Sequence, residues 1–247
     1  MIIKQPATTD IPALRDLWQQ AFGDTDGFLD IFFSTGFSFD RCRCLTVNGI
    51  LASGLYWFDC ALGNEKLAYI YAVATGEAFQ RQGLCAALME DTHQHLKDSG
   101  YDGAILVPGT EDLRRYYRRF GYANFGGISE TKVSAAKPLP IRPVSAEEYA
   151  ALRQKYLPSG GVELKGEMLT FFSKLARFYA GDGFVFAAEE NRVIPELLGD
   201  CPDIGGIAAA LGVTEMTVRT QGATPFAMYL PLEESQKAPA YFGIALD

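Results

Sequence analysis

The stretch from Tyr71 to Leu96 contains the residues best suited to bind an anion. Its turn, Gln80–Gly83, lies between an apolar, strand-like run and a helical pattern. A helix begins with several amide protons that have no partner and with a positive partial charge. Gly83 lets a negatively charged group approach these amides, and Arg81 adds a charge-assisted hydrogen bond. The same residues also fit a plain strand-to-helix turn, because a single glycine is common in turns.

Two motifs resemble those of the GCN5-related N-acetyltransferases, the GNAT family. This family binds the diphosphate of its coenzyme with R/Q-x-x-G-x-G/A at the start of the third helix, and Gln80, Gly83 and Cys85 fall on that pattern. Cys85 departs from it, since glycine or alanine is usual there, but the side chain stays small. The second motif is a tyrosine before a Gly-Phe or Gly-Tyr step, which Tyr117 and Gly121–Tyr122 match.

The resemblance covers about residues 1–135 and implies an acetyl-CoA-dependent N-acetyltransferase. In such an enzyme a primary amine attacks the thioester directly within a ternary complex. The coenzyme contacts that the resemblance implies are Val73, Ala74, Thr75, Gln80, Arg81, Gln82, Gly83, Leu84, Cys85 and Ala86. A noncatalytic acyl-CoA-binding sensor has the same features and remains an alternative, as does an acyl-enzyme formed on Cys85.

Acyl transfer needs a proton for the departing thiolate and a base for the attacking amine. By the resemblance, Tyr117 supplies the proton, since a tyrosine with a reference pKa of about 10 is protonated at neutral pH. The strand Leu67–Thr75 contains no carboxylate that could act as the base. In a subgroup similar to the enhanced-intracellular-survival acetyltransferases the terminal carboxylate reaches the active site, which makes Asp247 the second candidate catalytic residue. The alternatives are a Tyr117 that only packs and an Asp247 that ends a strand at the surface.

Composition and charge describe an ordinary folded protein. The 247 residues are 48% apolar and 21% charged, with a net charge of -8 and a pI near 4.9. Such an acidic protein is not expected to bind nucleic acid, and its charge mildly favours a cationic small substrate. The segment RRYYRR contains four arginines, Arg114, Arg115, Arg118 and Arg119. They fit a solvated helix face, or attraction of the 3'-phosphate of the coenzyme or of a partner. The N-terminus has no export signal and no apolar run has membrane-spanning length, so we expect a cytoplasmic protein without membrane contact.

We expect no metal site. The five cysteines are scattered, with no C-x-x-C pair and no histidine at zinc-like spacing. Cys42 and Cys44 share one face of a predicted strand, which fits two half-buried side chains or, alternatively, a metal or redox site. His93 and His95 are two positions apart on a helix, so they point in different directions and cannot chelate one ion.

Apolar periodicity predicts the elements that position these residues. Over residues 1–135 the order is βαα, β-hairpin, β, α, β, α, β, with the hairpin turn at Asn48–Gly49. The helix between Thr75 and Gly103 is a crossover that makes its flanking strands parallel. We therefore predict an α/β (α+β) fold of the GNAT type, with a central mixed, partly parallel sheet flanked by helices, followed by a smaller GNAT-like α/β domain.

A proline-rich linker, residues 136–145, separates the predicted GNAT domain, residues 1–135, from the second unit, residues 146–247. The pattern of the second unit predicts helices near 146–156, 165–180 and 203–211, strands near 183–188 and 192–198, and three closing strands, the last in YFGIALD. This unit resembles the degenerate second module of two-module relatives in RVIPELLGD, a helix, and the strands PFAMYLPL and YFGIALD. It has no copy of the coenzyme motif, so we expect it not to bind coenzyme. Its implied tasks are to shape the acceptor cleft and to cover the splayed sheet of the first module.

Residues 203–222 also resemble a helix-turn-helix, which would make the protein a DNA-binding transcriptional regulator. Gly205–Gly206 weaken the first helix, and Arg219 is the only basic residue in the second, whereas DNA contact usually needs several cations. The alternative is one helix that ends at Leu211, then a turn and a strand.

Overall fold

The computed structural model describes residues 1–190, 192–233 and 237–246. The first half of the chain forms, in order, β1 (Ile2–Lys4), α1 (Ile11–Phe22), α2 (Asp26–Thr35), β2 (Cys42–Val47), β3 (Ile50–Leu62), β4 (Glu65–Thr75), α3 (Leu84–Asp98), β5 (Gly103–Leu106), α4 (Glu111–Arg118) and β6 (Ala123–Ser134). The second half forms β7 (Arg142–Pro143), α5 (Ala146–Tyr156), β8 (Glu163–Leu164), α6 (Gly166–Leu175), β9 (Ala176–Gly181), β10 (Phe184–Glu189), β11 (Val193–Ile194), β12 (Glu196–Gly199), α7 (Ile204–Ala210), β13 (Glu215–Gln221) and β14 (Thr224–Pro231).

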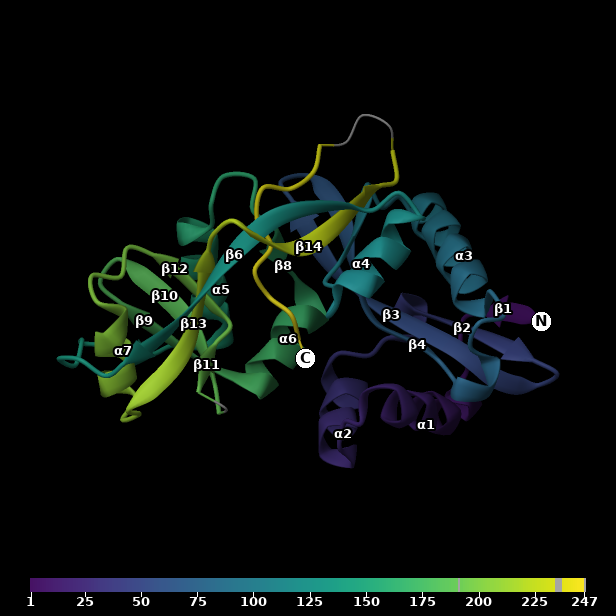
Figure 1. Ribbon diagram of the computed structural model, residues 1–247, viewed down its shortest axis with the longest axis horizontal. Helices are drawn as coiled ribbons and strands as arrows, with labels where there is room; N and C mark the ends of the chain where they lie inside the picture. The colour runs from purple at the N-terminus through teal and green to yellow at the C-terminus, as the bar shows by residue number, and fades with distance from the viewer. Residues whose placement is uncertain (191, 234–236, 247) are drawn as a thin grey trace.

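One ten-stranded sheet runs through most of the molecule, and a four-stranded sheet lies toward one end (Figure 1). The large sheet has the order β1-β2-β3-β4-β5-β14-β6-β13-β11, with β8 paired to β3, and the small sheet has the order β12-β10-β9-β7. Among the paired strands described, β4 with β5 and β11 with β13 are parallel, and the others are antiparallel. The predicted mixed, partly parallel sheet flanked by helices is confirmed, and α3 is the crossover between the parallel strands β4 and β5.

Strands β4 and β5 separate soon after they start. They pair only over Leu67–Tyr69 and Gly103–Ile105, although β4 continues to Thr75. Beyond the paired region, β4 has a bulge, where its register with β3 shifts and Ala72 adopts a positive φ of 48°. A bulge bends a strand and interrupts its ladder. The last residues of β4 therefore have no β5 partner in the described chain, and a ligand can use their backbone groups.

The two faces of the large sheet pack against different helices. One face packs against α1, α2 and α6, and its core is aromatic, with Trp18, Phe32, Tyr56, Phe58 and Phe171 almost completely buried. The other face packs against α3 and α4, and its core includes Leu88, Met89, Leu96, Tyr117 and Tyr122. Because successive residues of a strand point to opposite faces, β4 contributes side chains to both cores.

Strand β14 joins the two halves of the chain. It lies between β5 and β6, and it pairs antiparallel with both of them. Strand β13 extends the same sheet by pairing with β6 over all seven of its residues. In Figure 1, β6, β13 and β14 run side by side between the α3–α4 region and the small sheet. The proposed division into residues 1–135, 136–145 and 146–247 remains a prediction, and strands from both sides of it share one sheet.

The helix predicted for residues 165–180 is wrong in its second part. Helix α6 ends at Leu175, and Ala176–Gly181 forms β9, in which buried residues alternate with more exposed ones. This alternation has the period of a strand, and it places β9 antiparallel to β10. The prediction therefore extended the helix over residues that form a strand, because this strand follows the helix without a loop.

Two predicted strands of the second half also differ in the structure. The strand predicted for residues 192–198 is two short strands with Pro195 between them, since proline cannot donate to a ladder. The closing segment YFGIALD was predicted to be a strand, but its described part, residues 241–246, forms only a single bridge between Tyr241 and Gly161.

Residues 203–222 do not form two helices. Helix α7 covers Ile204–Ala210, and Glu215–Gln221 forms strand β13 instead of a recognition helix. Its register with β6 runs from Glu215 opposite Ser134 to Gln221 opposite Ile128. The structure therefore supports the helix, turn and strand reading of this segment.

A fragment of residues 1–135 is expected not to fold stably on its own. Without β14, the neighbouring edges of β5 and β6 lose their hydrogen-bond partners and expose buried side chains. Circular dichroism during heating should show a cooperative transition for the full chain and none for the fragment. A monodisperse fragment that melts cooperatively at the temperature of the full chain would contradict this prediction.

Candidate active site

The turn before α3 leaves the start of that helix open. Gly83 is the N-cap, with a positive φ of 80° and no side chain to accept a hydrogen bond from the helix. The first amide bonded back into the turn is that of Ala87, which donates to the Gly83 carbonyl at 3.0 Å. By helix geometry, the three preceding amides, Leu84–Ala86, have no partner within the helix. These amides carry the positive end of the α3 dipole.

Side-chain amides fix the shape of this turn. Gln80 donates to the Thr75 carbonyl at 3.2 Å and so joins the turn to the end of β4. Gln82 donates to the Ala78 carbonyl at 3.0 Å, within the turn itself. Glutamine suits both places because one side chain can reach a carbonyl several residues away and carries two donors.

A cavity of about 600 Å³ opens where α3 begins, between the end of β4 and α4. It is lined by Val73, Thr75, Phe79, Gln80, Arg81, Gly83, Leu84, Cys85, Ala86, Leu113, Tyr116, Tyr117 and Arg119. Two predicted contact residues are placed elsewhere. Ala74 is buried on the α1 side of β4, and Gln82 is exposed outside the lining. The size suits the part of a coenzyme that lies inside a protein.

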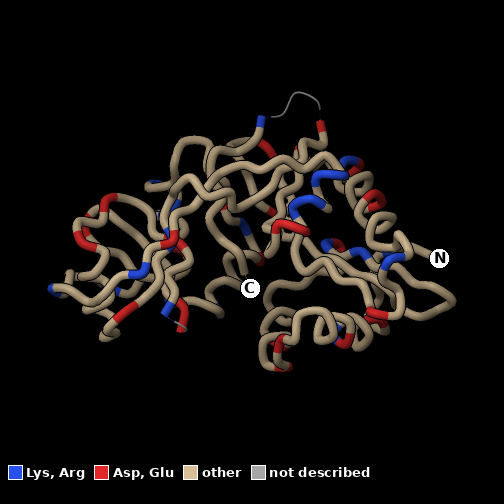
Figure 2. Tube along the Cα trace, viewed as in Figure 1, with Lys and Arg blue, Asp and Glu red and all other residues tan. Residues whose placement is uncertain are grey.

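The charges of the cavity favour an anion. Arg81 and Arg119 line it, and neither has an ion-pair partner in the described part of the chain. In contrast, Arg114 donates to two backbone carbonyls of the β14 strand, and Arg115 and Arg118 pair with acidic residues of α4 itself. Figure 2 shows the basic positions on α4 next to acidic ones. Of the predicted arginine cluster, Arg119 is thus the member available to a ligand in the cavity.

Two tyrosines of α4 face the cavity. Tyr117 is 7% exposed, and burial raises the pKa of its hydroxyl well above the ordinary value of about 10. Tyr116 is more exposed, and burial together with the neighbouring Cys85 thiol raises the pKa of its hydroxyl. The sequence motif identified Tyr117 alone, and nothing in the sequence distinguished Tyr116 from a surface residue beside it.

On the other face of β4, the C-terminal segment approaches the bulge. Tyr71, the residue before Ala72, donates its hydroxyl proton to the Leu246 carbonyl. Leu246 is 2% exposed, so it is held within the aromatic core of that face. The candidate residue Asp247 lies outside the described residues.

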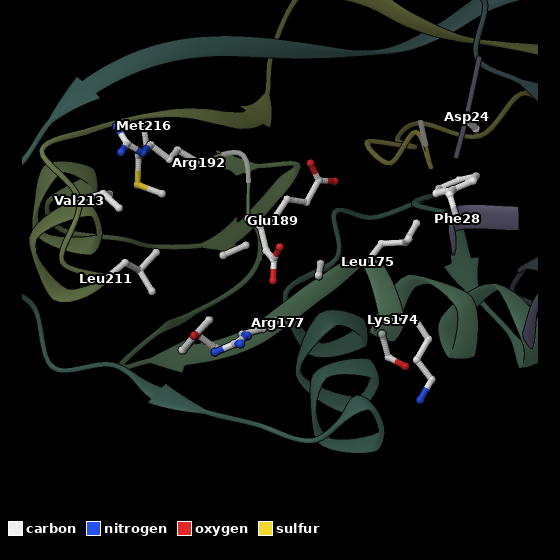
Figure 3. A pocket seen from close by; sticks show the side chains of 15 residues that line it. Asp24, Phe28, Lys174, Leu175, Arg177, Glu189, Arg192, Leu211, Val213 and Met216 are labelled. Atoms are coloured by element: carbon white, nitrogen blue, oxygen red, sulfur yellow. The ribbon is translucent and has the colours of Figure 1, made fainter. Parts of the chain in front are cut away.

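A second, larger cavity of about 840 Å³ lies between the start of α2 and the second half of the chain. In Figure 3, Phe28 and Leu175 stand at one end and Leu211, Val213 and Met216 at the other. Charged residues of both signs line it as well: Asp24, Lys174, Arg177, Glu189, Glu190 and Arg192.

Aromatic contacts connect the wall of this second cavity to β4. Phe28 lies 6.2 Å from the Trp18 ring, which in turn lies 5.5 Å from the Tyr71 ring. Asp24 accepts a hydrogen bond of 2.7 Å from the Trp18 indole nitrogen. A single aromatic ring, that of Trp18, therefore separates the cavity wall from the strand that borders the first cavity.

No group of metal ligands and no membrane-crossing helix occurs among the described residues. No three of their His, Cys, Asp or Glu side chains come together as a metal site, and no helix is both long and apolar enough to cross a bilayer. Cys42 and Cys44 are buried on β2, where burial raises the pKa of both thiols. Their environment therefore disfavours the thiolate that a metal or redox site requires.

Comparison with known proteins identifies the first half of the chain. A family model described as an acetyltransferase (GNAT) domain matches residues 3–125. No curated protein matches the chain. Three solved structures share its fold at low sequence identity. A GCN5-related N-acetyltransferase from Anabaena variabilis has a TM-score of 0.73 and 16% identity, over 94% of this chain and 73% of its own.

The two other structures cover similar shares of the chain. A GCN5-related N-acetyltransferase from Kribbella flavida has a TM-score of 0.70 and 14% identity, over 92% of this chain and 70% of its own. Eis1 from Mycobacterium abscessus has a TM-score of 0.69 and 13% identity, over 94% of this chain and 74% of its own. At these identities, the likeness extends the shared fold beyond the matched domain and into the second half of the chain.

Cys85 is expected to react slowly with iodoacetamide at neutral pH. Burial raises the pKa of its thiol, so little of the reactive thiolate is present at neutral pH. As long as the pH stays below that pKa, each rise of one pH unit increases the thiolate fraction about tenfold. Mass spectrometry of the labelled Cys85 peptide should show a rate that still rises above about pH 9. A rate that levels off near neutral pH would reveal a lowered pKa and restore Cys85 as a candidate nucleophile.

Proposed function

We propose that this chain, whose residues 3–125 belong to the acetyltransferase (GNAT) family, transfers an acetyl group from acetyl-CoA to a primary amine. The observation that carries this proposal is the first cavity, where the open start of α3 meets Arg81 and Arg119, two arginines without ion-pair partners among the described residues. The diphosphate of the coenzyme would accept hydrogen bonds from the amides of Leu84–Ala86, with Arg81 and Arg119 near its phosphates. Val73 and Thr75, at the end of β4 beyond its pairing with β5, would border the pantetheine arm.

The reaction is proposed to proceed by direct attack in a ternary complex. The amine nitrogen forms a bond to the thioester carbon, an oxyanion develops, and the carbon–sulfur bond then breaks. Tyr117 stays protonated across the neutral range because its pKa is raised, so it can donate a hydrogen bond to the sulfur as negative charge develops there. The proton that the sulfur finally takes is balanced by the proton that the amine loses. Direct attack also agrees with the raised pKa of the Cys85 thiol, which makes that residue a poor nucleophile.

The acceptor amine is proposed to enter from the second cavity. Its apolar wall at Phe28 is one ring away from Tyr71, on the face of β4 opposite the proposed coenzyme cradle. Charges of both signs line the cavity, so it suits a polar amine that also carries apolar groups. An amine at Tyr71 would meet the thioester where β4 and β5 have separated.

A noncatalytic acyl-CoA sensor remains the alternative function, because the coenzyme cradle alone would serve it. Release of coenzyme A thiol in the presence of a panel of amines separates the two. Tight coenzyme binding without thiol release on any polyamine, aminoglycoside or peptide amine would favour the sensor. The regulator alternative has lost its main support, since residues 215–221 form β13.

Replacing Tyr117 with Phe is expected to lower kcat by about 100-fold, in the range for loss of a general acid. The dissociation constant for acetyl-CoA should change little, because the ring and the cavity wall remain. Tyr116→Phe is the matched control, since it removes a neighbouring hydroxyl whose partner is Cys85 and should keep most of the activity. Thiol release and calorimetry give the two readouts. Equal kcat for wild type and Tyr117→Phe would show that Tyr117 only packs.

Asp247 is proposed to supply the carboxylate that takes the proton of the amine, because the residue before it is held at Tyr71. Deleting Asp247 should cut turnover sharply at pH values where the amine is mostly protonated, and less at high pH where the amine is already neutral. Unchanged turnover over the whole pH profile would remove Asp247 and leave water as the proton acceptor.

A further inference from the structure

A buried ion pair lies in the second half of the chain, and neither of its residues is among the candidate catalytic residues. Arg153 of α5 donates to Glu196 of β12 through two nitrogens, at 2.7 Å and 3.0 Å. Their side chains are only 3% and 1% exposed. Removing two charges from water is costly, and such pairs often contribute little net stability compared with apolar residues of the same size.

The ion pair is bonded to the C-terminal segment, residues 240–246. The Tyr241 hydroxyl lies beside the Glu196 carboxylate, and burial together with that negative charge raises the pKa of the hydroxyl. Arg153 also donates to the Val162 carbonyl at 2.8 Å, and the Val162 amide donates to the Tyr241 carbonyl at 2.9 Å. The Ala240 amide adds a bond of 2.7 Å to the Gly160 carbonyl. Side chain and backbone of Tyr241 are thus fixed from two directions.

The same segment is attached to β4 a few residues later. The Phe242 ring lies 5.0 Å from the Tyr69 ring, in an edge-on arrangement. The Leu246 carbonyl accepts the hydroxyl proton of Tyr71, next to the bulge at Ala72. Between these anchors, Ile244 and Ala245 are buried in the aromatic core. The chain from Tyr241 to Leu246 is therefore held at both ends, with one end on the ion pair and the other on the strand of the proposed active site.

We propose that the Arg153–Glu196 ion pair is a positioning device for acetyl transfer: through Tyr241 it fixes segment 240–246, which in turn holds Tyr71 and the β4 bulge. This inference rests on the proposed function, because it assigns the acetyl-transfer step to the neighbourhood of that bulge. The pair does not touch the reacting groups. It acts by limiting where the end of the segment and the Tyr71 side chain lie, and displacements of about 1 Å at a reacting centre can cost 100-fold in rate.

Two tyrosines have hydroxyls next to the same carboxylate, which allows a matched test. Tyr241→Phe removes the hydroxyl through which the segment faces Glu196. Tyr149→Phe removes a hydroxyl that donates to the same carboxylate at 3.1 Å, but Tyr149 belongs to α5 and not to the segment. Each variant loses one hydroxyl next to Glu196 and keeps its ring, so both should fold. A purely structural role of the ion pair predicts the same effect for both.

The expected result is a fall in kcat of about tenfold for Tyr241→Phe, with Tyr149→Phe within about twofold of wild type. The acetyl-CoA dissociation constant, measured by calorimetry, should stay the same in both, because the coenzyme cradle lies on the other face of β4. Hydrogen exchange supplies a readout besides activity: the amides of Ala240 and Val162 should exchange faster in Tyr241→Phe only. Tyr71→Phe, at the far anchor, should lower kcat similarly without changing exchange at Ala240.

Other outcomes would overturn the inference. Faster exchange at Ala240 with unchanged kcat would show that the segment is anchored but does not position the reaction. An equal loss of kcat in Tyr241→Phe and Tyr149→Phe would assign the ion pair a general stabilising role. A wild-type protein that binds acetyl-CoA but acetylates no amine would contradict the proposed function instead, and equal exchange in all variants would then contradict the anchoring as well.

Discussion

The structure depends on one electrostatic arrangement, the unpaired amides at the start of α3. Gly83 ends the preceding turn without a side chain to cap the helix, so these amides face the cavity with the positive end of the helix dipole. The cavity exists because β4 and β5 stop pairing after Tyr69 and Ile105. Two features that are each unfavourable in isolation, an uncapped helix start and a strand edge without its neighbour, thus border one cavity, and they are the binding groups of the proposed site.

The second half of the chain supports this region with strand β14 and with the C-terminal segment. Strand β14 supplies the missing neighbour of β5 and β6, so the sheet remains continuous where β4 diverges. The C-terminal segment then packs on the face of β4 that the coenzyme cavity does not use, and Leu246 meets Tyr71 there. In this arrangement the separated strands are supported on both sides. The strand edges left open by the first half of the chain are therefore covered by strands of the second half.

Local patterns in the sequence predicted most of the fold and part of the site. Alternation and helical spacing gave the element order up to Ser134, and the Gln80–Gly83 turn predicted where the cavity lies. They did not predict that α6 would pass directly into β9 at Ala176, since no glycine or proline marks that change. Nor did they predict the side-chain directions around Ala72, because a bulge with a positive φ changes which face each later residue of β4 occupies.

The missing parts of the site have a common cause, which is that they depend on contacts between distant residues. The pairing of Tyr116 with Cys85 and of Tyr71 with Leu246 joins elements far apart in the chain. No spacing rule along the sequence reports such contacts. The partners of buried groups such as Glu196 also became visible only in the structure, because a carboxylate in a strand is ordinarily read as a surface residue.

The most direct test is a titration of the ¹⁵N-labelled protein with coenzyme A, followed by amide chemical shifts. Saturable shifts concentrated at the amides of Leu84–Ala86 and at Val73 and Thr75 are the predicted result, since those groups are proposed to contact the diphosphate and the pantetheine arm. Unmoved signals at Leu84–Ala86 at saturating coenzyme, or saturable shifts confined to another part of the molecule, would contradict it.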